Sequence, residues 1–243
     1  MIPLSVPNIN GNEWKYVKDC LDTGWISSAG EYVNQFEEAI KNYTGAKYAI
    51  ACMSGTAGLQ VSLNLAGVTN NDIVIAPNLT FVATINAISY SGAQTVLIDV
   101  CEDSWQIDVD LLEKWLTKNT ATTIVGDKTI TIEKLSGKKI GSIMPVYVLG
   151  GFVNTDKLLK ISTKYGIPII EDSTEALGSF KKGKHAGTFG LTGVLSFNGN
   201  KIISTGGGGM ILTNNKEIAI RARHITTTAK SDPLEYFHDE VGY

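Results

Sequence analysis

The chain has 243 residues, of which 43% are hydrophobic and 19% are charged, and its formal net charge at pH 7 is −3. This composition is typical of a globular protein and gives no basic surface for nucleic acid. Because no stretch approaches the roughly 18 consecutive apolar residues of a membrane helix, we expect no membrane partner.

The amino end lacks the basic and apolar regions of a signal peptide. Three cysteines, Cys20, Cys52 and Cys101, are widely spaced and form neither a disulfide framework nor a CxxC metal motif. Both features are typical of a reduced compartment, so we expect a cytoplasmic protein. The two glycosylation sequons, at Asn42 and Asn78, are then expected to be chance matches.

Segments with helical periodicity alternate with short apolar segments along most of the chain. The pattern predicts helices at residues 12–24, 31–45, 54–67, 81–92, 108–119 and 154–166. It predicts strands at residues 48–53, 72–77, 94–100, 141–149 and 167–172.

These strands are continuous apolar runs between amphipathic helices, which indicates an α/β fold with a mainly parallel central sheet and helices on both faces. Residues 186–197 and 208–214 read as two further strands with no helix between them. We expect these two to form an antiparallel pair at the sheet edge. The polar insertion at 123–139 predicts a hairpin.

Three other patterns carry little weight. Residues 178–185, GSFKKGKH, match a phosphate-binding loop except that His185 stands where serine or threonine should hold magnesium. His185, His224 and His238 are too dispersed to predict a zinc site, so we expect no metal. Ser54 lies outside any G-x-S-x-G elbow, which argues against an esterase.

Polar residues and a lysine follow the predicted strands, where open α/β sheets bind ligands. Asp172 ends one strand, Ser196 ends another, and Lys201 precedes four glycines at 206–209. A lysine becomes a nucleophile when its amine is neutral, which burial or neighbouring cations favour. The glycines either let the backbone approach a planar ligand or form a tight turn.

Several residue types here match the parts of one cofactor. Gly55 and Thr56 open a predicted helix, so their N–H groups and the Thr56 hydroxyl can hold a phosphate. Phe81 can stack on a flat ring or pack in the core. Asp172 can pair with a protonated heteroaromatic nitrogen or cap its strand. Together with Lys201, these groups predict a site for pyridoxal phosphate.

The sequence resembles the nucleotide-sugar aminotransferases of the DegT/DnrJ/EryC1/StrS family, a branch of the fold-type-I pyridoxal-phosphate enzymes. The resemblance is carried by GWISSAGEYVNQFEEAI at 24–40, SGTAGL at 54–59, PNLTFVATINAISYSGA at 77–93, MPVYVLGG at 144–151, IPIIEDSTEALGS at 167–179 and SFNGNKIISTGGGGM at 196–210. It implies that residues 1–243 form an amino-terminal arm and the large cofactor-binding domain. The family's smaller carboxy-terminal domain is then absent from this chain.

The resemblance also implies roles for individual residues. Lys201 would bind the cofactor covalently and later move protons, and Asp172 would pair with the pyridine nitrogen. Phe81 would cover the ring. The phosphate would be held by Gly55, Thr56 and Ser196.

Two residues depart from the common family pattern. Glu175 stands where many members have Gln or His, and Gly207 replaces a glutamate in the run after the lysine. By resemblance, Glu175 lies beside the cofactor's phenolic oxygen, and we hypothesise that it is protonated and donates a hydrogen bond there. Both variants are similar to a subgroup that makes precursors of bacillosamine and legionaminic acid.

The resemblance implies transamination of a keto group on a nucleotide-linked deoxysugar, in cell-surface or secondary-metabolite sugar biosynthesis, with glutamate as amino donor. It also implies a homodimer with a shared active site. Trp25–Ser28 and Asn200 are candidates for partner contacts, although Trp25–Ser28 also reads as a plain loop.

Two alternative functions stay open. One is a pyridoxal-phosphate dehydratase or lyase, and the other is a non-catalytic module that senses cofactor or sugar. Lys201 argues against the resembling sugar dehydratases, which carry His at its place. The pair of Lys201 and Asp172 argues against a sensor, because a sensor need not keep a proton shuttle.

Overall fold

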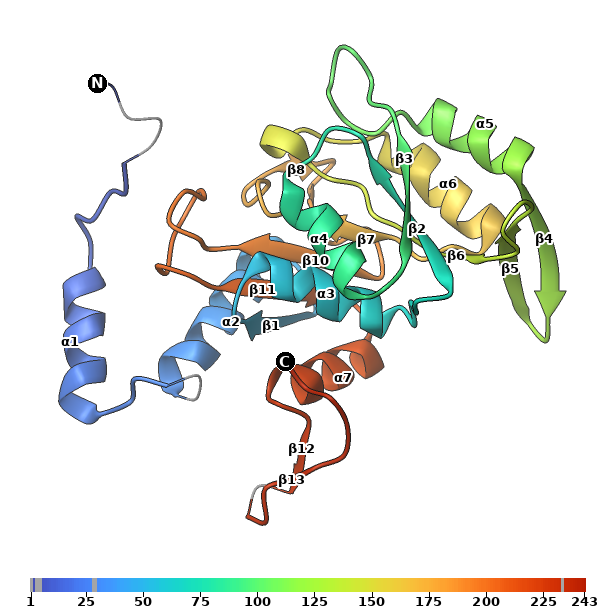
Figure 1. Cartoon of the computed structure of the whole chain (residues 1–243). Coiled ribbons are helices and arrows are strands. Elements are labelled where there is room, and N and C mark those ends of the chain that lie inside the picture. Colours follow the sequence, from blue (N-terminus) through green and yellow to red (C-terminus); the bar gives the residue numbers. More distant parts are fainter. Residues whose placement is uncertain (1, 3–5, 28–29, 233) are drawn as a thin grey trace.

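The computed structural model describes residue 2 and residues 6–27, 30–232 and 234–243 (Figure 1). The helices are α1 Glu13–Thr23, α2 Glu31–Thr44, α3 Gly55–Leu65, α4 Val82–Tyr90, α5 Val109–Asn119, α6 Thr155–Tyr165 and α7 Lys216–Thr226, with a 3-10 turn at Val148–Gly150. The strands are β1 Tyr48–Cys52, β2 Asp72–Pro77, β3 Gln94–Ile98, β4 Thr120–Val125, β5 Lys128–Glu133, β6 Lys139–Ile143, β7 Ile170–Asp172, β8 Phe180–Lys181, β9 Lys184–His185, β10 Thr192–Ser196, β11 Gly209–Thr213, β12 Lys230–Asp232 and β13 Phe237–His238.

The central sheet has two segments, with strand orders β3-β2-β6-β5-β4 and β1-β11-β10-β7. Parallel bridges from Ile143 to Ile169 and from Val146 to Asp172 join the segments. Strands β2, β3 and β6 pair in parallel, as do β7 and β10, whereas β11 runs antiparallel to β1 and β10. The predicted α/β fold with parallel central strands is confirmed, and the sheet as a whole is mixed, because β5 also runs antiparallel to β4 and β6.

Helices cover both faces of this sheet, as predicted, because neighbouring strand residues point to opposite sides. Ile73 and Ile75 of β2 pack in a cluster with α5 and α6, whereas Val74 and Ala76 pack with α3 and α4. At the other segment, α2 and α7 pack in separate clusters on opposite sides of β1. The core therefore forms two layers, one above and one below the strands (Figure 1).

The far end of the sheet differs from the sequence prediction. β10 and β11 do pair antiparallel, but β1 lies outside them, so their pair is not at the edge. The predicted hairpin exists as β4 and β5. The sequence pattern gave no prediction for α7 or for the short pair of β12 and β13.

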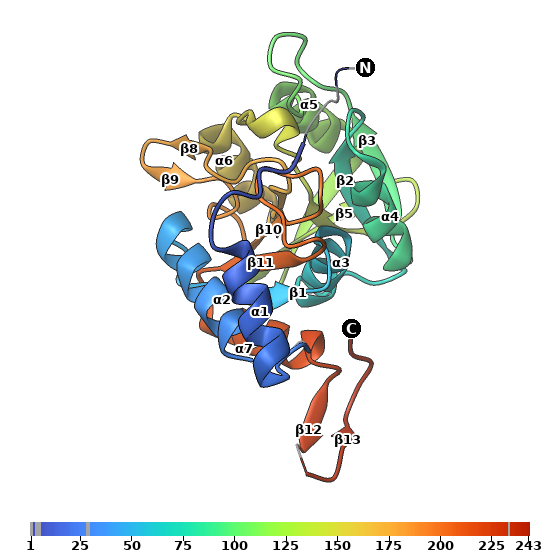
Figure 2. The same cartoon turned by 90° about the vertical axis from the view of Figure 1, so that its left-hand side faces the viewer.

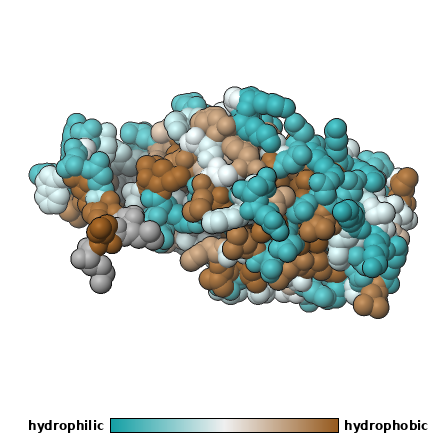
Figure 3. All heavy atoms as spheres, turned by 90° about the horizontal axis from the view of Figure 1, so that it is seen from above, coloured by the Kyte–Doolittle hydropathy of each residue, from teal (hydrophilic) through white to brown (hydrophobic). Residues whose placement is uncertain are grey.

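Helix α1 stands apart from the body of the molecule in Figure 1, and Figure 2, which looks from that side, shows it in front of α2. Among its residues, 13–23, all of which are described, none is buried. Seen from above, hydrophobic and hydrophilic residues are interspersed over the surface (Figure 3). Within the described part of the chain, no helix has both the length and the apolar character to cross a membrane.

Candidate active site

One cavity of about 300 Å³ opens where several strands end. It is bounded by the start of α3, the start of α4, the ends of β7 and β10, and the loop between β10 and β11. All seven predicted site residues line it: Gly55, Thr56, Phe81, Asp172, Glu175, Ser196 and Lys201. The structure therefore brings together residues that lie up to 146 positions apart, from 55 to 201.

The start of α3 is built to face a ligand. The Ser54 hydroxyl caps the helix by accepting the Ala57 N–H at 3.1 Å. The first N–H groups of a helix have no acceptor within it, so those of Gly55 and Thr56 are available to an anion. A Cβ on Gly55 would lie 2.9 Å from the Cβ of Ser196, which shows how closely the helix start and the end of β10 approach.

The glycine run after Lys201 serves a close backbone crossing as well as a turn. A Cβ on Gly209 would lie 2.5 Å from the carbonyl carbon of Ser54, so no side chain fits there. Gly208 pairs with Ser54 through a parallel bridge. This crossing holds the end of the lysine-bearing loop against the beginning of α3.

Asp172 is almost fully buried, with 3% of its surface exposed. Its Oδ2 accepts a hydrogen bond from the Thr84 hydroxyl at 2.6 Å, and its Oδ1 accepts the Thr174 N–H at 3.2 Å. Burial raises the pKa of Asp172, while these hydrogen bonds and the charge of Lys201 oppose the rise. Its carboxylate is a buried group with acceptor capacity left for a ligand.

The side chain of Lys201 reaches into the cavity and is 13% exposed. Its Nζ lies 3.5 Å from Glu175 Oε1 and 5.7 Å from the ring centre of Phe81. Phe81 itself is 62% exposed, so it is not a core residue and its ring is free to cover a ligand.

Glu175 connects the lysine to a strained loop. Its Oε2 accepts the Leu149 N–H at 2.9 Å, while its Oε1 faces Lys201. Leu149 has a left-handed backbone with φ 51°, which is uncommon for a residue with a side chain. Glu175 thus accepts one hydrogen bond and forms an ion pair with Lys201 in this structure, and its protonation beside a cofactor stays a prediction.

The structure shows neighbours that sequence reasoning missed. Thr84 and Thr174 contact Asp172, and the Leu149 N–H contacts Glu175. Thr84 lies in the first turn of α4, whereas Thr80 precedes the helix, and the contact of Thr84 with Asp172 had no signal in the local sequence.

Two predicted partner contacts are placed only in part. Asn200 lines the cavity, and its Oδ1 accepts a hydrogen bond from the Asn198 amide at 3.0 Å. Trp25 and Ile26 are exposed. Ser28 lies outside the described residues.

The phosphate-loop pattern at 178–185 has a different structure. Its residues form the hairpin of β8 and β9 rather than a loop that leads into a helix. His185 is fully buried, and its Nε2 accepts the Gly178 N–H at 2.9 Å. Burial lowers the pKa of His185, so this histidine is a neutral structural group.

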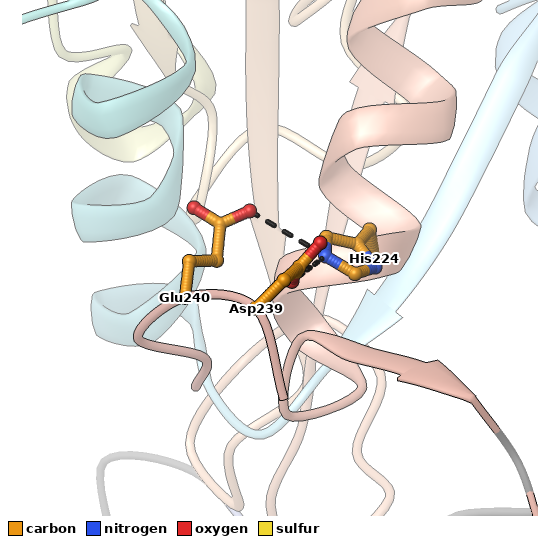
Figure 4. A group of neighbouring side chains, drawn as sticks. All are labelled: His224, Asp239 and Glu240. Carbon is orange, nitrogen blue, oxygen red and sulfur yellow. Dashed lines mark hydrogen bonds and ion pairs between the residues drawn. The ribbon is translucent and has the colours of Figure 1, made fainter. Parts of the chain in front are cut away.

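A second group of ionisable side chains lies at the end of α7 (Figure 4). His224 Nε2 lies 2.7 Å from Asp239 Oδ1 and 3.5 Å from Glu240 Oε1. The hydrogen bond with His224 lowers the pKa of Asp239, and Arg221 forms an ion pair with Glu240. Because each carboxylate has a partner on α7, these contacts fasten 239–240 to that helix. The spacing of the histidines alone gave no sign of this group.

The chemistry of the cavity fits pyridoxal phosphate. A phosphate needs N–H and hydroxyl donors, a protonated pyridine nitrogen needs a carboxylate, and an aldehyde needs an amine. Gly55, Thr56 and Ser196 supply the donors, Asp172 supplies the carboxylate, and Lys201 supplies the amine. All five residues line the same cavity.

Comparison with known proteins identifies relatives of the whole chain. It is 36% identical over its full length to the GDP-perosamine synthase of Caulobacter vibrioides, and 36% identical to the putative pyridoxal phosphate-dependent aminotransferase EpsN of Bacillus subtilis. It covers 60% and 59% of these two proteins, respectively, so it spans about three fifths of their length.

Solved structures agree with this relationship. An aminotransferase from Psychrobacter cryohalolentis superposes with a TM-score of 0.84 at 27% identity, over 99% of this chain and 59% of that one. The putative sugar aminotransferase Spr1654 from Streptococcus pneumoniae, in its PMP form, superposes with a TM-score of 0.82 at 26% identity, over 100% of this chain and 61% of that one. The sequence profile of one family matches residues 7–243. The chain belongs to the DegT/DnrJ/EryC1/StrS aminotransferase family, whose enzymes use pyridoxal phosphate.

Proposed function

We propose that the protein is a pyridoxal-phosphate-dependent aminotransferase that converts a keto group of a nucleotide-linked deoxysugar into an amine, with glutamate as donor. The observation that carries this proposal is the cavity in which the Lys201 amine, the buried Asp172 carboxylate and the start of α3 meet. The relatives support it, because one is a GDP-perosamine synthase and another a putative sugar aminotransferase.

The chain's own residues divide the work of holding the cofactor. The N–H groups of Gly55 and Thr56 and the hydroxyl of Ser196 bind the phosphate, because they converge at the start of α3. Asp172 holds a proton on the pyridine nitrogen by offering a buried negative charge. The exposed ring of Phe81 covers one face of the cofactor.

Lys201 has two tasks in this proposal. Its amine would hold the cofactor covalently at rest, and the same amine, when free, would carry a proton to and from the reacting carbon. Bound pyridoxal phosphate supplies the aldehyde for this attachment and a ring that accepts the electrons released at a deprotonated carbon. Proton transfer by a positioned amine contributes roughly 10²–10⁴-fold to such a reaction.

The test uses the full-length protein loaded with pyridoxal phosphate. Adding glutamate without any sugar should remove the absorbance of the aldehyde form of the cofactor, and adding a keto-sugar nucleotide should restore it. Mass spectrometry of the nucleotide fraction should then detect the amino sugar. Loss of water from the sugar without amination, or a cofactor that no amino acid converts, would contradict the proposal. Lys201→Ala is the matched control and should do neither step catalytically.

The panel of keto-sugar nucleotides also identifies the substrate. GDP-linked keto sugars test the likeness to GDP-perosamine synthases, and keto sugars linked to other nucleotides test the subgroup that makes bacillosamine and legionaminic acid precursors. We propose a cytoplasmic enzyme of amino-sugar biosynthesis, since Cys20, Cys52 and Cys101 are free thiols.

We further propose that two copies of the chain form a homodimer that shares the active site. Large apolar side chains at and beside the cavity residues are exposed, including Met53 at 75%, Leu149 at 76% and Ile202 at 60%. Exposed apolar groups around a site are typical of a surface that another chain covers. Sedimentation of the full-length protein should show a dimer, and an active monomer throughout a dilution series would contradict it.

A further inference from the structure

A threonine behind the cavity controls one oxygen of Asp172. Thr84 is fully buried in the first turn of α4, and its hydroxyl lies 2.6 Å from Asp172 Oδ2. It does not line the cavity itself; its neighbours Phe81 and Ala83 do. Thr84 therefore contacts the carboxylate from outside the lining of the cavity.

The direction of the hydrogen bonds follows from the proton count. Thr84 Oγ1 also lies 2.7 Å from Thr80 Oγ1. A hydroxyl carries one proton, and an ionised carboxylate can only accept. When Asp172 is ionised, Thr84 donates to it and accepts from Thr80, whose hydroxyl also lies 3.2 Å from the Phe81 carbonyl oxygen. The two threonine hydroxyls then form a chain of donors that ends on Asp172 Oδ2.

This chain of donors opposes the effect of burial on Asp172. Burial raises the pKa of Asp172, and the hydrogen bond from Thr84 is the largest of the effects that lower it. The charge of Lys201 faces Asp172 across the cavity, where Glu175 also lies. Helix α3 has no ionisable side chain, and α4 has only Tyr90 at its far end. Within the described residues around it, Asp172 thus depends strongly on an uncharged donor.

We propose that Thr84 is a positioning residue: its hydroxyl, oriented by Thr80, fixes Asp172 Oδ2 and leaves the carboxylate ionised to receive the protonated nitrogen of the cofactor. The last part rests on the proposed function. Thr80 and Thr84 lie on either side of Phe81 in the sequence. One hydrogen-bonded turn therefore positions both Asp172, which would pair with the nitrogen, and Phe81, which would cover the ring.

The first experiment needs no cofactor. Thr84→Val removes the hydroxyl but keeps the shape, and Thr84→Ser keeps the hydroxyl. The carboxyl ¹³C signal of Asp172, assigned with Asp172→Asn, is titrated in the cofactor-free full-length protein. We expect the midpoint to rise by about one pH unit in Thr84→Val and to return to the wild-type value in Thr84→Ser. Equal midpoints in wild type and Thr84→Val would overturn the proposal.

A second variant covers the case in which Thr84→Val fails to fold. Thr80→Val removes the outer hydroxyl and leaves Thr84 free to rotate its proton away from the carboxylate. Its midpoint should shift in the same direction by a smaller amount. If the titration midpoint of Asp172 does not shift in Thr80→Val, Thr80 does not orient the Thr84 hydroxyl, and that part of the proposal is wrong.

The second experiment measures the Kd for pyridoxal phosphate against pH. Raising the pKa of Asp172 leaves less carboxylate at low pH, so below the titration midpoint of the wild type Thr84→Val should bind up to about tenfold more weakly and approach the wild type as pH rises. An equal loss at every pH indicates a purely structural role and contradicts the proposal. If the wild type does not bind the cofactor, the proposed function fails, and the cofactor-free titration still decides the role of Thr84.

Discussion

Two neighbouring carboxylates on β7 differ in how far the chain itself satisfies their hydrogen-bond acceptors. Glu171 and Asp172 are both buried, with 0% and 3% of their surfaces exposed, and they point to opposite faces of the sheet. Asp172 accepts two hydrogen bonds and borders the cavity. Glu171 accepts four, from the hydroxyl of Tyr147 at 2.5 Å and from the N–H groups of Gly187, Phe189 and Gly190.

The difference separates a structural carboxylate from a functional one. A carboxylate has about four acceptor positions, and the chain itself fills those of Glu171. Its donors fix the 187–190 loop, and Asp172 depends on that support because both residues lie on one short strand. Asp172 keeps unused acceptor capacity toward a cavity that also contains an amine. Burial raises the pKa of both groups, so the unfilled positions, and not the pKa, distinguish them.

The largest expected effect comes from Asp172→Asn. The amide keeps the shape but cannot hold the pyridine nitrogen in its protonated form, so turnover should fall roughly 100-fold or more. The variant should still bind cofactor, and its free energy of unfolding should fall by only about 1 kcal/mol, because the Thr84 hydroxyl can rotate to accept from the new amide. Steady-state kinetics and urea unfolding measure both. Near-normal turnover would remove Asp172 from the site.

The converse is expected for Glu171→Gln. One oxygen becomes an NH₂ group that faces donors, so about two N–H or O–H groups lose their acceptor. At about 1–3 kcal/mol for each unsatisfied buried group, unfolding should become easier by about 3 kcal/mol. Turnover per folded molecule should fall less than in Asp172→Asn. A variant that is fully stable but inactive would reverse the assignment of the two carboxylates.

Tyr147→Phe tests the same side of β7 more gently. It removes one of the four donors to Glu171 and leaves the three backbone donors in place. We expect a loss of about 1–2 kcal/mol in the free energy of unfolding, measured by urea denaturation. Cofactor affinity should match the wild type. A larger effect on affinity than on stability would link Glu171 to the cavity after all.

Much of this arrangement could be predicted from local sequence. The strand ends at Asp172 and Ser196 and the helix start at Gly55 follow from apolar runs and glycine positions, and they identify one edge of a sheet. Lys201 follows the strand that ends at Ser196, so it is expected at the same ligand-binding edge. Helix α7 could also have been predicted from the sequence. Asn215 is a typical capping residue, and the residues that are buried, Ala219, Ala222 and Ile225, have helical spacing.

Other features depend on contacts between distant segments. The position of β1 outside β11 follows from pairing between distant residues, such as Ala49 with Leu212, which lie 163 positions apart, and no local pattern encodes it. The contact of Thr84 with Asp172 depends on the rotation of α4 against β7. Glu171 and Asp172 are adjacent acidic residues that the sequence does not distinguish. Only the folded 187–190 loop shows that the acceptor positions of Glu171 are already filled by N–H groups.

The smallest expected effect concerns a third carboxylate, Glu175, which is partly exposed beside Lys201. Glu175→Gln keeps an oxygen that can accept the Leu149 N–H. If Glu175 is protonated beside the bound cofactor, as hypothesised, the pH titration of the cofactor's absorbance and most of the activity should be unchanged. A fall of the titration midpoint by about one unit or more shows an ionised glutamate and rules the hypothesis out.

The most direct test of the account is the identity of the lysine that binds the cofactor. The full-length protein is loaded with pyridoxal phosphate, reduced with borohydride, digested and mapped by mass spectrometry. The modified peptide should carry the cofactor on Lys201. Lys201→Ala should lose this label, and Lys181→Ala, an exchange in the β8 strand away from the cavity, should keep it. A label on another lysine of the wild-type protein would contradict the account.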